Sequence, residues 1–120
     1  MAEVEYIKKK QQFNLVYENG KLARGSLLFI KTMPNGLDFS RYGSIVSKRI
    51  GKAVIRNKVK RRLREIMRQV IFKPGWDIVI YTRPAIAVAK YDDLRNMILS
   101  LLSKAHLLVE RYERACPGAD

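Results

Sequence analysis

The stretch that decides the fold is residues 41–65, which read RYGSIVSKRIGKAVIRNKVKRRLRE. It begins inside a predicted strand over residues 37–47, whose larger apolar residues include Tyr42 and Ile45. From residue 53 onward apolar positions recur at helical spacing, which predicts a helix over about 53–70. At about 100° per residue, one side of this helix gathers the apolar residues Ile55, Val59, Leu63, Ile66, Met67 and Val70.

A further strand is predicted after this helix, at Trp76–Thr82, ending at Arg83-Pro84. A strand, a helix and a second strand in this order are expected to form a parallel crossover. Such crossovers are right-handed in nearly all proteins, so the general rule predicts a right-handed connection here.

The elements on the N-terminal side are a helix and a hairpin. Residues Gln11–Asn19 are predicted to form a helix that Gly20 ends. A strand over 22–31 follows, and the turn Pro34-Asn35-Gly36 is typical of a β-hairpin to the strand over 37–47.

On the C-terminal side, a final helix is predicted from Asp92 to about Arg114, with residues 115–120 as a frayed tail. The predicted fold class is α+β, an α/β sandwich with the order α-β-β-β-α-β-α and one mixed sheet packed by helices. One of the three strands before the middle helix is optional in this order and has no range of its own. No linker or repeat divides the chain, which indicates a single domain over 1–120.

Positive charge is concentrated in the same stretch. The chain has 24 Lys and Arg residues against 11 Asp and Glu, a formal net charge of +13. Residues 41–64 hold ten of the basic residues and no acidic one, so the rest of the chain is nearly neutral. A single intensely basic segment is typical of proteins that bind a polyanion, whereas solvated surfaces usually mix both signs.

Composition argues against several other classes. The longest apolar run, Ala85–Ala89, is far shorter than the roughly 20 residues of a membrane helix, and the start lacks the apolar stretch of a secretory signal. Cys116 is the only cysteine, which excludes an internal disulfide and, with the single His106, gives too few ligands for a zinc site. We therefore expect a cytoplasmic protein with no membrane partner and no metal site of its own.

No set of side chains in the sequence suits catalysis by the protein. His106 is predicted to be a partly buried structural residue beside the apolar stripe of the last helix. Asp92 and Asp93 are predicted to serve as the cap and dipole partner at the start of that helix. Glu65 is predicted to pair with an arginine three or four residues away, Arg61 or Arg68. Gly51-Lys52 lacks the second glycine of a phosphate-binding loop.

Binding residues are more abundant. Beside the apolar stripe of the 53–70 helix, an arc of about 140° carries Arg56, Asn57, Lys60, Arg61, Arg64 and Arg68. Like charges so close together repel one another, and a phosphate backbone along the arc would remove that repulsion. Phe13 and Tyr17 share one face of the first helix and suit either base stacking or core packing, and the sequence leaves both open. Phe29 is more typical of a core.

The basic stretch resembles the signature of the bacterial ribonuclease P protein subunit. The similarity is carried by the ungapped run from Ser47-Lys48-Arg49 through Gly51, Ala53-Val54 and Arg56-Asn57 to Lys60-Arg61. It extends more weakly over nearly the whole chain, to Phe13, Tyr17, Gly20, Arg83-Pro84 and Tyr91-Asp92-Asp93-Leu94.

The resemblance implies a function and the residues that carry it. The protein would be the subunit of a ribonucleoprotein endoribonuclease whose catalytic RNA removes the 5′ leader of precursor tRNA. Mg²⁺ would be held mainly by the RNA and the substrate, and no obligate protein partner is implied. The residues implied to bind RNA are Lys48, Arg49, Lys52, Arg56, Asn57, Lys60, Arg61, Arg62, Arg64 and Arg68.

A cleft between the first helix and the sheet would take the single-stranded leader. The cleft residues implied by the resemblance are Phe13, Tyr17, Phe29, Lys31 and Ile45. The family also has an unusual left-handed crossover around its basic helix, which opposes the general rule. Two alternatives are a basic RNA-binding or ribosomal-type protein without a catalytic partner, and a nuclease whose active site lies in the protein.

Overall fold

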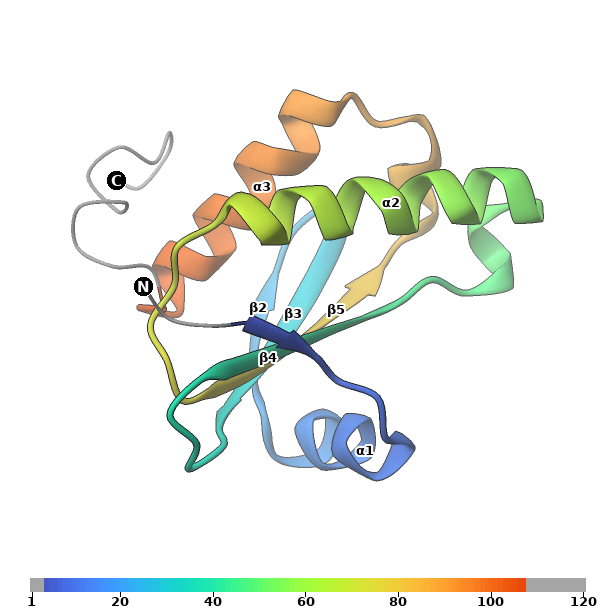
Figure 1. Cartoon of the computed structure of the whole chain (residues 1–120). Coiled ribbons are helices and arrows are strands. Elements are labelled where there is room, and N and C mark those ends of the chain that lie inside the picture. Colours follow the sequence, from blue (N-terminus) through green and yellow to red (C-terminus); the bar gives the residue numbers. More distant parts are fainter. Residues whose placement is uncertain (1–3, 108–120) are drawn as a thin grey trace.

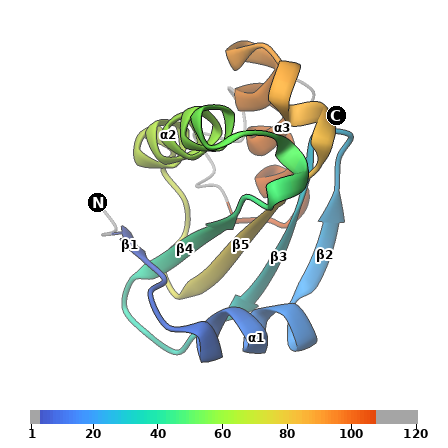
Figure 2. The same cartoon turned by 90° about the vertical axis from the view of Figure 1, so that its right-hand side faces the viewer.

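The computed structural model describes residues 4–107, with side chains from Tyr6 onward. Eight helices and strands make up this part of the chain: β1 (Val4–Tyr6), α1 (Lys10–Asn19), β2 (Lys21–Arg24), β3 (Leu28–Pro34), β4 (Ser40–Ile45), α2 (Ala53–Gln69), β5 (Trp76–Thr82) and α3 (Tyr91–Lys104). Two short 3₁₀ helices lie between them, η1 (Lys48–Ile50) and η2 (Pro84–Val88). Helices α2 and α3 cover one face of the sheet and α1 covers the other (Figures 1 and 2).

The sheet is mixed, as predicted, and has five strands in the order β1-β4-β5-β3-β2. The short edge strand β1 was not predicted from the sequence; it pairs in parallel with β4. The single strand predicted over 22–31 is in fact two strands, β2 and β3, joined by a tight turn in which the Gly25 N–H donates to the Leu28 carbonyl at 2.9 Å.

The predicted hairpin at Asn35-Gly36 is wrong, because β5 lies between β3 and β4. Strand β5 pairs antiparallel with β3 and parallel with β4, and residues 77–81 are all buried. Asn35 is used differently from a hairpin residue: its side chain accepts from the Leu37 N–H at 2.8 Å and donates to Asp77 at 3.0 Å. The Asn35-Gly36 turn signal therefore predicted the wrong strand pairing, because the buried strand β5 takes the central position in the sheet.

The connection β4–α2–β5 is the expected parallel crossover, and it is left-handed. In Figure 2 both strands point toward the viewer, β4 lies to the left of β5, and α2 lies above them. The chain therefore passes over the sheet in the sense opposite to the usual one. The family resemblance implied this hand correctly and the general rule did not.

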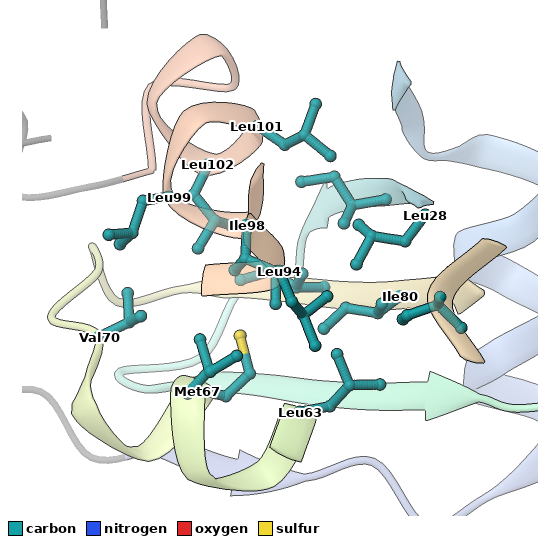
Figure 3. Close-up of a cluster of buried hydrophobic side chains, with 14 of the residues drawn as sticks. Leu28, Leu63, Met67, Val70, Ile80, Leu94, Ile98, Leu99, Leu101 and Leu102 are labelled. Atoms are coloured by element: carbon teal, nitrogen blue, oxygen red, sulfur yellow. The ribbon is translucent and has the colours of Figure 1, made fainter. Parts of the chain in front are cut away.

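The larger core lies between the sheet and the helices α2 and α3 (Figure 3). Leu63 and Met67 of α2 meet Ile80 of β5 and Ile98 of α3, all at most 1% exposed. Truncating such a side chain to alanine typically costs about 2–5 kcal/mol. A smaller core on the opposite face joins Ile7 and Val16 to Val79 and Tyr81. The predicted apolar stripe of α2 is confirmed except for Ile55, which is 36% exposed near the start of the helix.

The last helix ends earlier than predicted, at Lys104. His106 adopts a positive φ of 60°, its N–H donates to the Ser103 carbonyl, and the Leu107 N–H donates to the Leu102 carbonyl, which together close the helix in a Schellman motif. Leu107 is fully buried, whereas His106 is exposed, so the prediction of a partly buried histidine is wrong.

The start of α3 agrees in part with the sequence analysis. Asp92 and Asp93 lie in its first turn and favour the helix dipole as predicted, but the cap position is Lys90. Residues 108–114 of the predicted helix, the tail 115–120 and Cys116 lie outside the described residues.

Candidate nucleic-acid interface

Helix α2 divides into a buried side and a cationic side. Val59, Leu63, Ile66 and Met67 enter the core, which turns the predicted arc toward solvent. Most of the predicted RNA-binding side chains are exposed: Lys48, Arg49, Lys52, Asn57, Lys60, Arg61, Arg64 and Arg68. Within residues 6–107, no carboxylate lies within 4.0 Å of any of them. These cations are therefore available to an external anion.

Glu65 does not form the pair predicted for it. Among the described side chains it lies within ion-pair distance of neither Arg61 nor Arg68, and it is exposed. An exposed pair gains little over two solvated charges, which explains why none forms. Desolvation and, after it, the charge of Glu65 raise the pKa of the Tyr91 hydroxyl.

Two arginines of the predicted set are held by the backbone. The Arg56 Nε donates to the Gly51 carbonyl at 3.2 Å, which directs this guanidinium along the start of α2. Arg62 donates to the Ala89 carbonyl at 3.1 Å, so it faces the segment between η2 and α3. Arg62 thus lies on the flank of α2 away from the arc.

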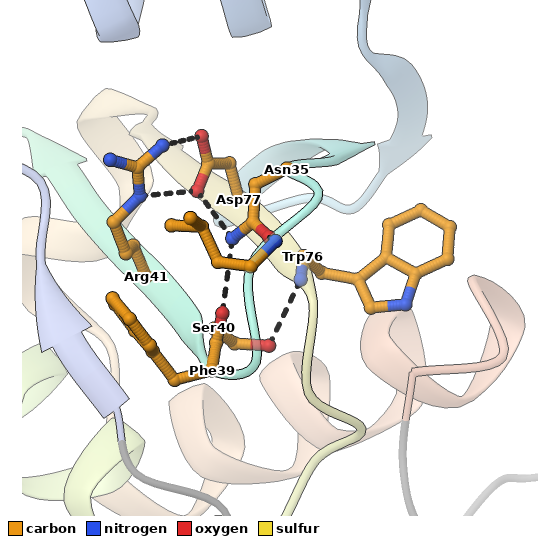
Figure 4. Close-up of polar contacts among 7 residues, drawn as sticks. Asn35, Phe39, Ser40, Arg41, Trp76 and Asp77 are labelled. Carbon is orange, nitrogen blue, oxygen red and sulfur yellow. Dashed lines mark hydrogen bonds and ion pairs between the residues drawn. The ribbon is translucent and has the colours of Figure 1, made fainter.

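Arg41 belongs to the basic stretch in sequence but not to the exposed cations. Its Nε and one terminal nitrogen donate to the two carboxylate oxygens of Asp77 at 2.8 and 2.7 Å (Figure 4). Asp77 is only 4% exposed and also accepts from Asn35. Ser40 continues this network, donating to the Lys73 carbonyl and accepting from the Trp76 N–H. Arg41 therefore ties β4 to β5 through Asp77, and Asn35 ties the loop between β3 and β4 to the same carboxylate.

A groove of about 710 Å³ lies beside the cationic arc. It runs between α2, the β1–β4 edge of the sheet and the start of α1, and its lining contains four cations and no carboxylate. The lining residues are Tyr6, Lys8, Lys10, Phe13, Asn14, Tyr42, Ser44, Ile45, Val46, Lys60 and Arg64. Lys8 and Lys10 were not among the predicted site residues. Burial is the main cause of the raised pKa of Tyr42, and the nearby charge of Arg64 opposes it.

Phe13 forms one wall of the groove and also packs as core. Its ring lies directly on Gly43, where an added Cβ would come within 2.5 Å of two ring carbons. It also packs against the smaller core around Val79. Phe13 therefore takes the core packing that the sequence left open, and base stacking at the groove stays a prediction. Tyr17 is 56% exposed.

A second group of predicted cleft residues surrounds Tyr81 of β5. Phe29 stacks on Tyr81 with centroids 4.7 Å apart and an interplanar angle of 10°, and Tyr17 meets Tyr81 edge-on at 5.8 Å. The Lys31 Nζ lies 4.0 Å above the Tyr17 ring and donates to the Tyr17 carbonyl at 2.6 Å. On the outer side, the Arg83 guanidinium lies 5.2 Å from the Phe29 ring.

The five predicted cleft residues thus lie on one face of the sheet in two groups. Phe13 and Ile45 line the groove, and Tyr17, Phe29 and Lys31 surround Tyr81. We call the second group, with Tyr81, the aromatic cluster. From the sequence, Tyr81 is simply part of the predicted strand Trp76–Thr82, although its alternation with Val79 could have placed both residues on the face that α1 covers.

The chain matches the family model described as Ribonuclease P over residues 1–106. The chain belongs to the ribonuclease P protein family. Its relatives include the ribonuclease P protein component of Dehalococcoides mccartyi strain CBDB1, 39% identical over 114 residues that cover 95% of each chain. The component from Caldanaerobacter subterraneus subsp. tengcongensis is 42% identical over 107 residues, covering 88% of this chain and 92% of the relative.

Solved ribonuclease P proteins have the same fold. The Thermotoga maritima protein superimposes with a TM-score of 0.75 at 33% identity, covering 83% of this chain and 96% of that one. The Staphylococcus aureus protein gives a TM-score of 0.78 at 28% identity, covering 89% and 100%.

Family membership carries direct consequences. The chain is a protein component of ribonuclease P, a ribonucleoprotein endoribonuclease of tRNA 5′ maturation, and its partner is the ribonuclease P RNA. The alternative of a basic RNA-binding protein without a catalytic partner is not favoured. Within residues 4–107, no helix is long and apolar enough to cross a membrane.

Proposed function

We propose that this protein works in the cytoplasm with two adjoining binding surfaces, one for the ribonuclease P RNA and one for the 5′ leader of precursor tRNA. The RNA surface is the cationic arc of α2 with Lys48, Arg49 and Lys52 before it. The leader surface is the groove and the aromatic cluster beside α1. The observation that carries the proposal is the exposed, carboxylate-free row of cations that continues into the groove through Lys60 and Arg64.

The two surfaces suit different parts of a nucleic acid. Arginine forks and lysine charges along an exposed helix suit the dense phosphates of a folded RNA. Aromatic rings beside a groove suit an unpaired strand, whose bases can stack on them. Lys60 and Arg64 belong to both surfaces. The leader would therefore enter the groove at the point where the groove meets the cationic arc.

We assign the cleavage chemistry to the RNA subunit. Mg²⁺ prefers oxygen ligands and often binds through phosphates, which the RNA and the substrate supply in abundance. Within residues 6–107, the structure has no group of three or more His, Cys, Asp or Glu side chains arranged to hold a metal ion. The protein would screen phosphate repulsion and hold the leader, which should lessen the Mg²⁺ requirement of the RNA.

The test is substrate preference in the reconstituted holoenzyme. Binding of precursor tRNA and of mature tRNA is measured with the ribonuclease P RNA, in the presence and absence of the protein. We expect the protein to raise affinity for the precursor and to leave affinity for the mature tRNA nearly unchanged. Equal gains for both would overturn the assignment of a leader surface.

A parallel assay tests the non-catalytic role of the protein. One solved Staphylococcus aureus relative is described as a mutant with defective mRNA degradation activity, so cleavage of mRNA belongs in this assay beside precursor tRNA. The protein, purified free of RNA, is incubated with each substrate in Mg²⁺, and we expect neither to be cut. Cleavage that persists after contaminating nucleases have been removed would place an active site in the protein.

A further inference from the structure

A second, smaller pocket lies on the face of the sheet that α3 covers. It has a volume of about 270 Å³, and its walls come from the edge strand β2, the neighbouring strand β3, the start of β5 and the end of α3. Strand β2 is at the opposite edge of the sheet from β1, and the pocket shares no residue with the groove beside α1. We call it the Trp76 pocket, after the ring that lines it.

Trp76 gives this pocket an aromatic wall and a free donor. Its indole extends from β5 away from the hydrogen bonds of Ser40 and Asp77 (Figure 4) and packs against the larger core. Within residues 6–107, no other aromatic ring and no cation lies against the indole. In the same part of the chain the indole N–H has no hydrogen-bond partner, yet it is not sealed from solvent.

Thr32 brings a hydroxyl to the same pocket. It alternates along β3 with Leu28 and Ile30 of the larger core, so its side chain lies on the α3 face of the sheet. Thr32 is 3% exposed, and its hydroxyl makes no hydrogen bond to the described residues. The hydroxyl is not among the sealed atoms, so its small remaining exposure opens on the pocket. A polar group at this depth normally has a partner, and the pocket is where a partner can reach it.

Two lysines complete the lining and face no carboxylate. Lys21 of β2 pairs with Thr32 across the strands, so the two side chains leave the same face of the sheet. Lys104 comes from the last turn of α3. Both lysines are exposed, and within residues 6–107 neither has a carboxylate within 4.0 Å. The last carbonyls of α3 are bonded in its Schellman motif, which leaves the ammonium groups available to an external anion.

These groups together define the chemistry of a ligand. A flat heterocycle suits the indole surface, a phosphate suits two ammonium groups, and the hydroxyl and the indole N–H can bond to a base or a sugar. The volume is close to the lower limit of small-molecule sites, about 300 Å³, which suits a ligand no larger than one nucleotide. An acidic peptide would match the lysines but would leave the aromatic wall without a counterpart.

We propose that the Trp76 pocket binds one nucleotide, with its base against Trp76 and its phosphate between Lys21 and Lys104. The nucleotide is either free in solution or an unpaired residue of the RNA subunit, and both present the same heterocycle and phosphate. This site is additional to the two surfaces proposed above and depends on neither of them.

Trp76 is the only tryptophan of the chain, so its fluorescence reports on the pocket directly. The full chain is titrated with AMP, with adenosine, which lacks the phosphate, and with ribose 5-phosphate, which lacks the base. We expect saturable quenching by AMP and weaker binding of adenosine. Ribose 5-phosphate should compete with AMP without quenching Trp76 itself.

Substitutions test whether the quenching comes from this pocket. Lys21→Ala and Lys104→Ala should each weaken AMP binding by about 3- to 10-fold, the effect of one lost hydrogen bond. Thr32→Val removes the hydroxyl and keeps the shape, so it should weaken binding by a similar factor without lowering the Tm. Lys90→Ala is the matched control, because Lys90 is the cap residue at the other end of α3 and AMP affinity should be unchanged.

The same titration of the protein assembled with the ribonuclease P RNA distinguishes the two sources. If assembly quenches Trp76, Lys104→Ala reduces that quenching, and AMP adds nothing further, the RNA supplies the nucleotide. If assembly leaves Trp76 unquenched and AMP still binds, the ligand is a free nucleotide.

Two results would overturn the inference. One is the absence of saturable quenching by AMP in the full chain. The other is quenching that Lys21→Ala and Lys104→Ala leave unchanged, which would mean that AMP acts from another cationic surface. Precursor tRNA plays no part in these measurements, so a failure of the proposed leader surface would leave their outcome unaffected.

Discussion

The cationic arc of α2 and the aromatic cluster beside α1 differ in how they are built. The arc is an exposed row of charges whose members make few contacts with the rest of the protein. The cluster is half-buried, and each of its rings touches another ring or a cation. The arc can therefore meet a phosphate backbone with little reorganisation, whereas the rings of the cluster are already in contact with one another. Salt should weaken binding at the arc far more than binding at the cluster.

The largest expected effect comes from removing two charges of the arc. Arg61→Ala with Arg64→Ala should weaken binding of the ribonuclease P RNA by roughly 10-fold or more, because charge-assisted contacts to phosphate are lost. The slope of log K against log salt should become shallower by up to about one unit per lost contact. Filter binding or calorimetry at several salt concentrations measures both quantities.

Arg62→Ala is the control for this comparison. Arg62 has the same charge and lies on the same helix, but its guanidinium is bonded to the Ala89 carbonyl on the other flank. In Arg62→Ala, the slope of log K against log salt should equal that of the unsubstituted protein. Equal slopes for the control and the double variant would contradict the arc as the RNA surface.

A smaller effect should separate two rings of the leader surface. Phe13→Ala removes a ring that is packed on Gly43, so both leader affinity and the free energy of unfolding should fall. Tyr17→Ala removes a ring that is mostly exposed, so leader affinity should fall with little change in stability. The loss of stacking in each is expected to be about 1–3 kcal/mol.

Thermal unfolding and binding of a leader oligonucleotide to the holoenzyme check this second prediction. Assembly with the RNA subunit should remain intact in both variants. If Phe13→Ala lowered stability alone, Phe13 would be a core residue and the groove would need another stacking partner.

The smallest effect is a loss of stability at alkaline pH, which depends on how far the Tyr81 hydroxyl is shielded from water. The pKa of Tyr81 is raised to about 12 in the folded protein from an ordinary value of 10.0. As pH rises, the hydroxyl in the unfolded chain therefore loses its proton before the hydroxyl in the folded protein does. The free energy of unfolding is at its full value below pH 10 and declines as pH rises toward 12. In Tyr81→Phe this decline should be less steep. Unfolding followed by circular dichroism at pH 9 and pH 11 would show it, and parallel declines would mean that the hydroxyl is well solvated.

Much of the site was predictable because it is local in sequence. The spacing of Val59, Leu63, Ile66 and Met67 fixes which side of α2 is buried, and the cationic arc follows from that spacing alone. The Asn35-Gly36 signal was just as local, yet it predicted the wrong pairing. Turn residues report only the backbone of the turn, and the partner of β3 was decided by the burial of β5.

By itself, therefore, the sequence determined the amphipathic helix, its charge and the family motif, since each depends on residues a few positions apart. Only the tertiary structure decided which cations are free and which are used internally. Arg41 and Arg61 are chemically identical, but Asp77, thirty-six residues away from Arg41, takes up only the first. The same holds for the surroundings of Tyr81, because Tyr17 and Phe29 reach it from α1 and β3. Contacts between distant segments arise from packing the whole chain, and no local pattern encodes them.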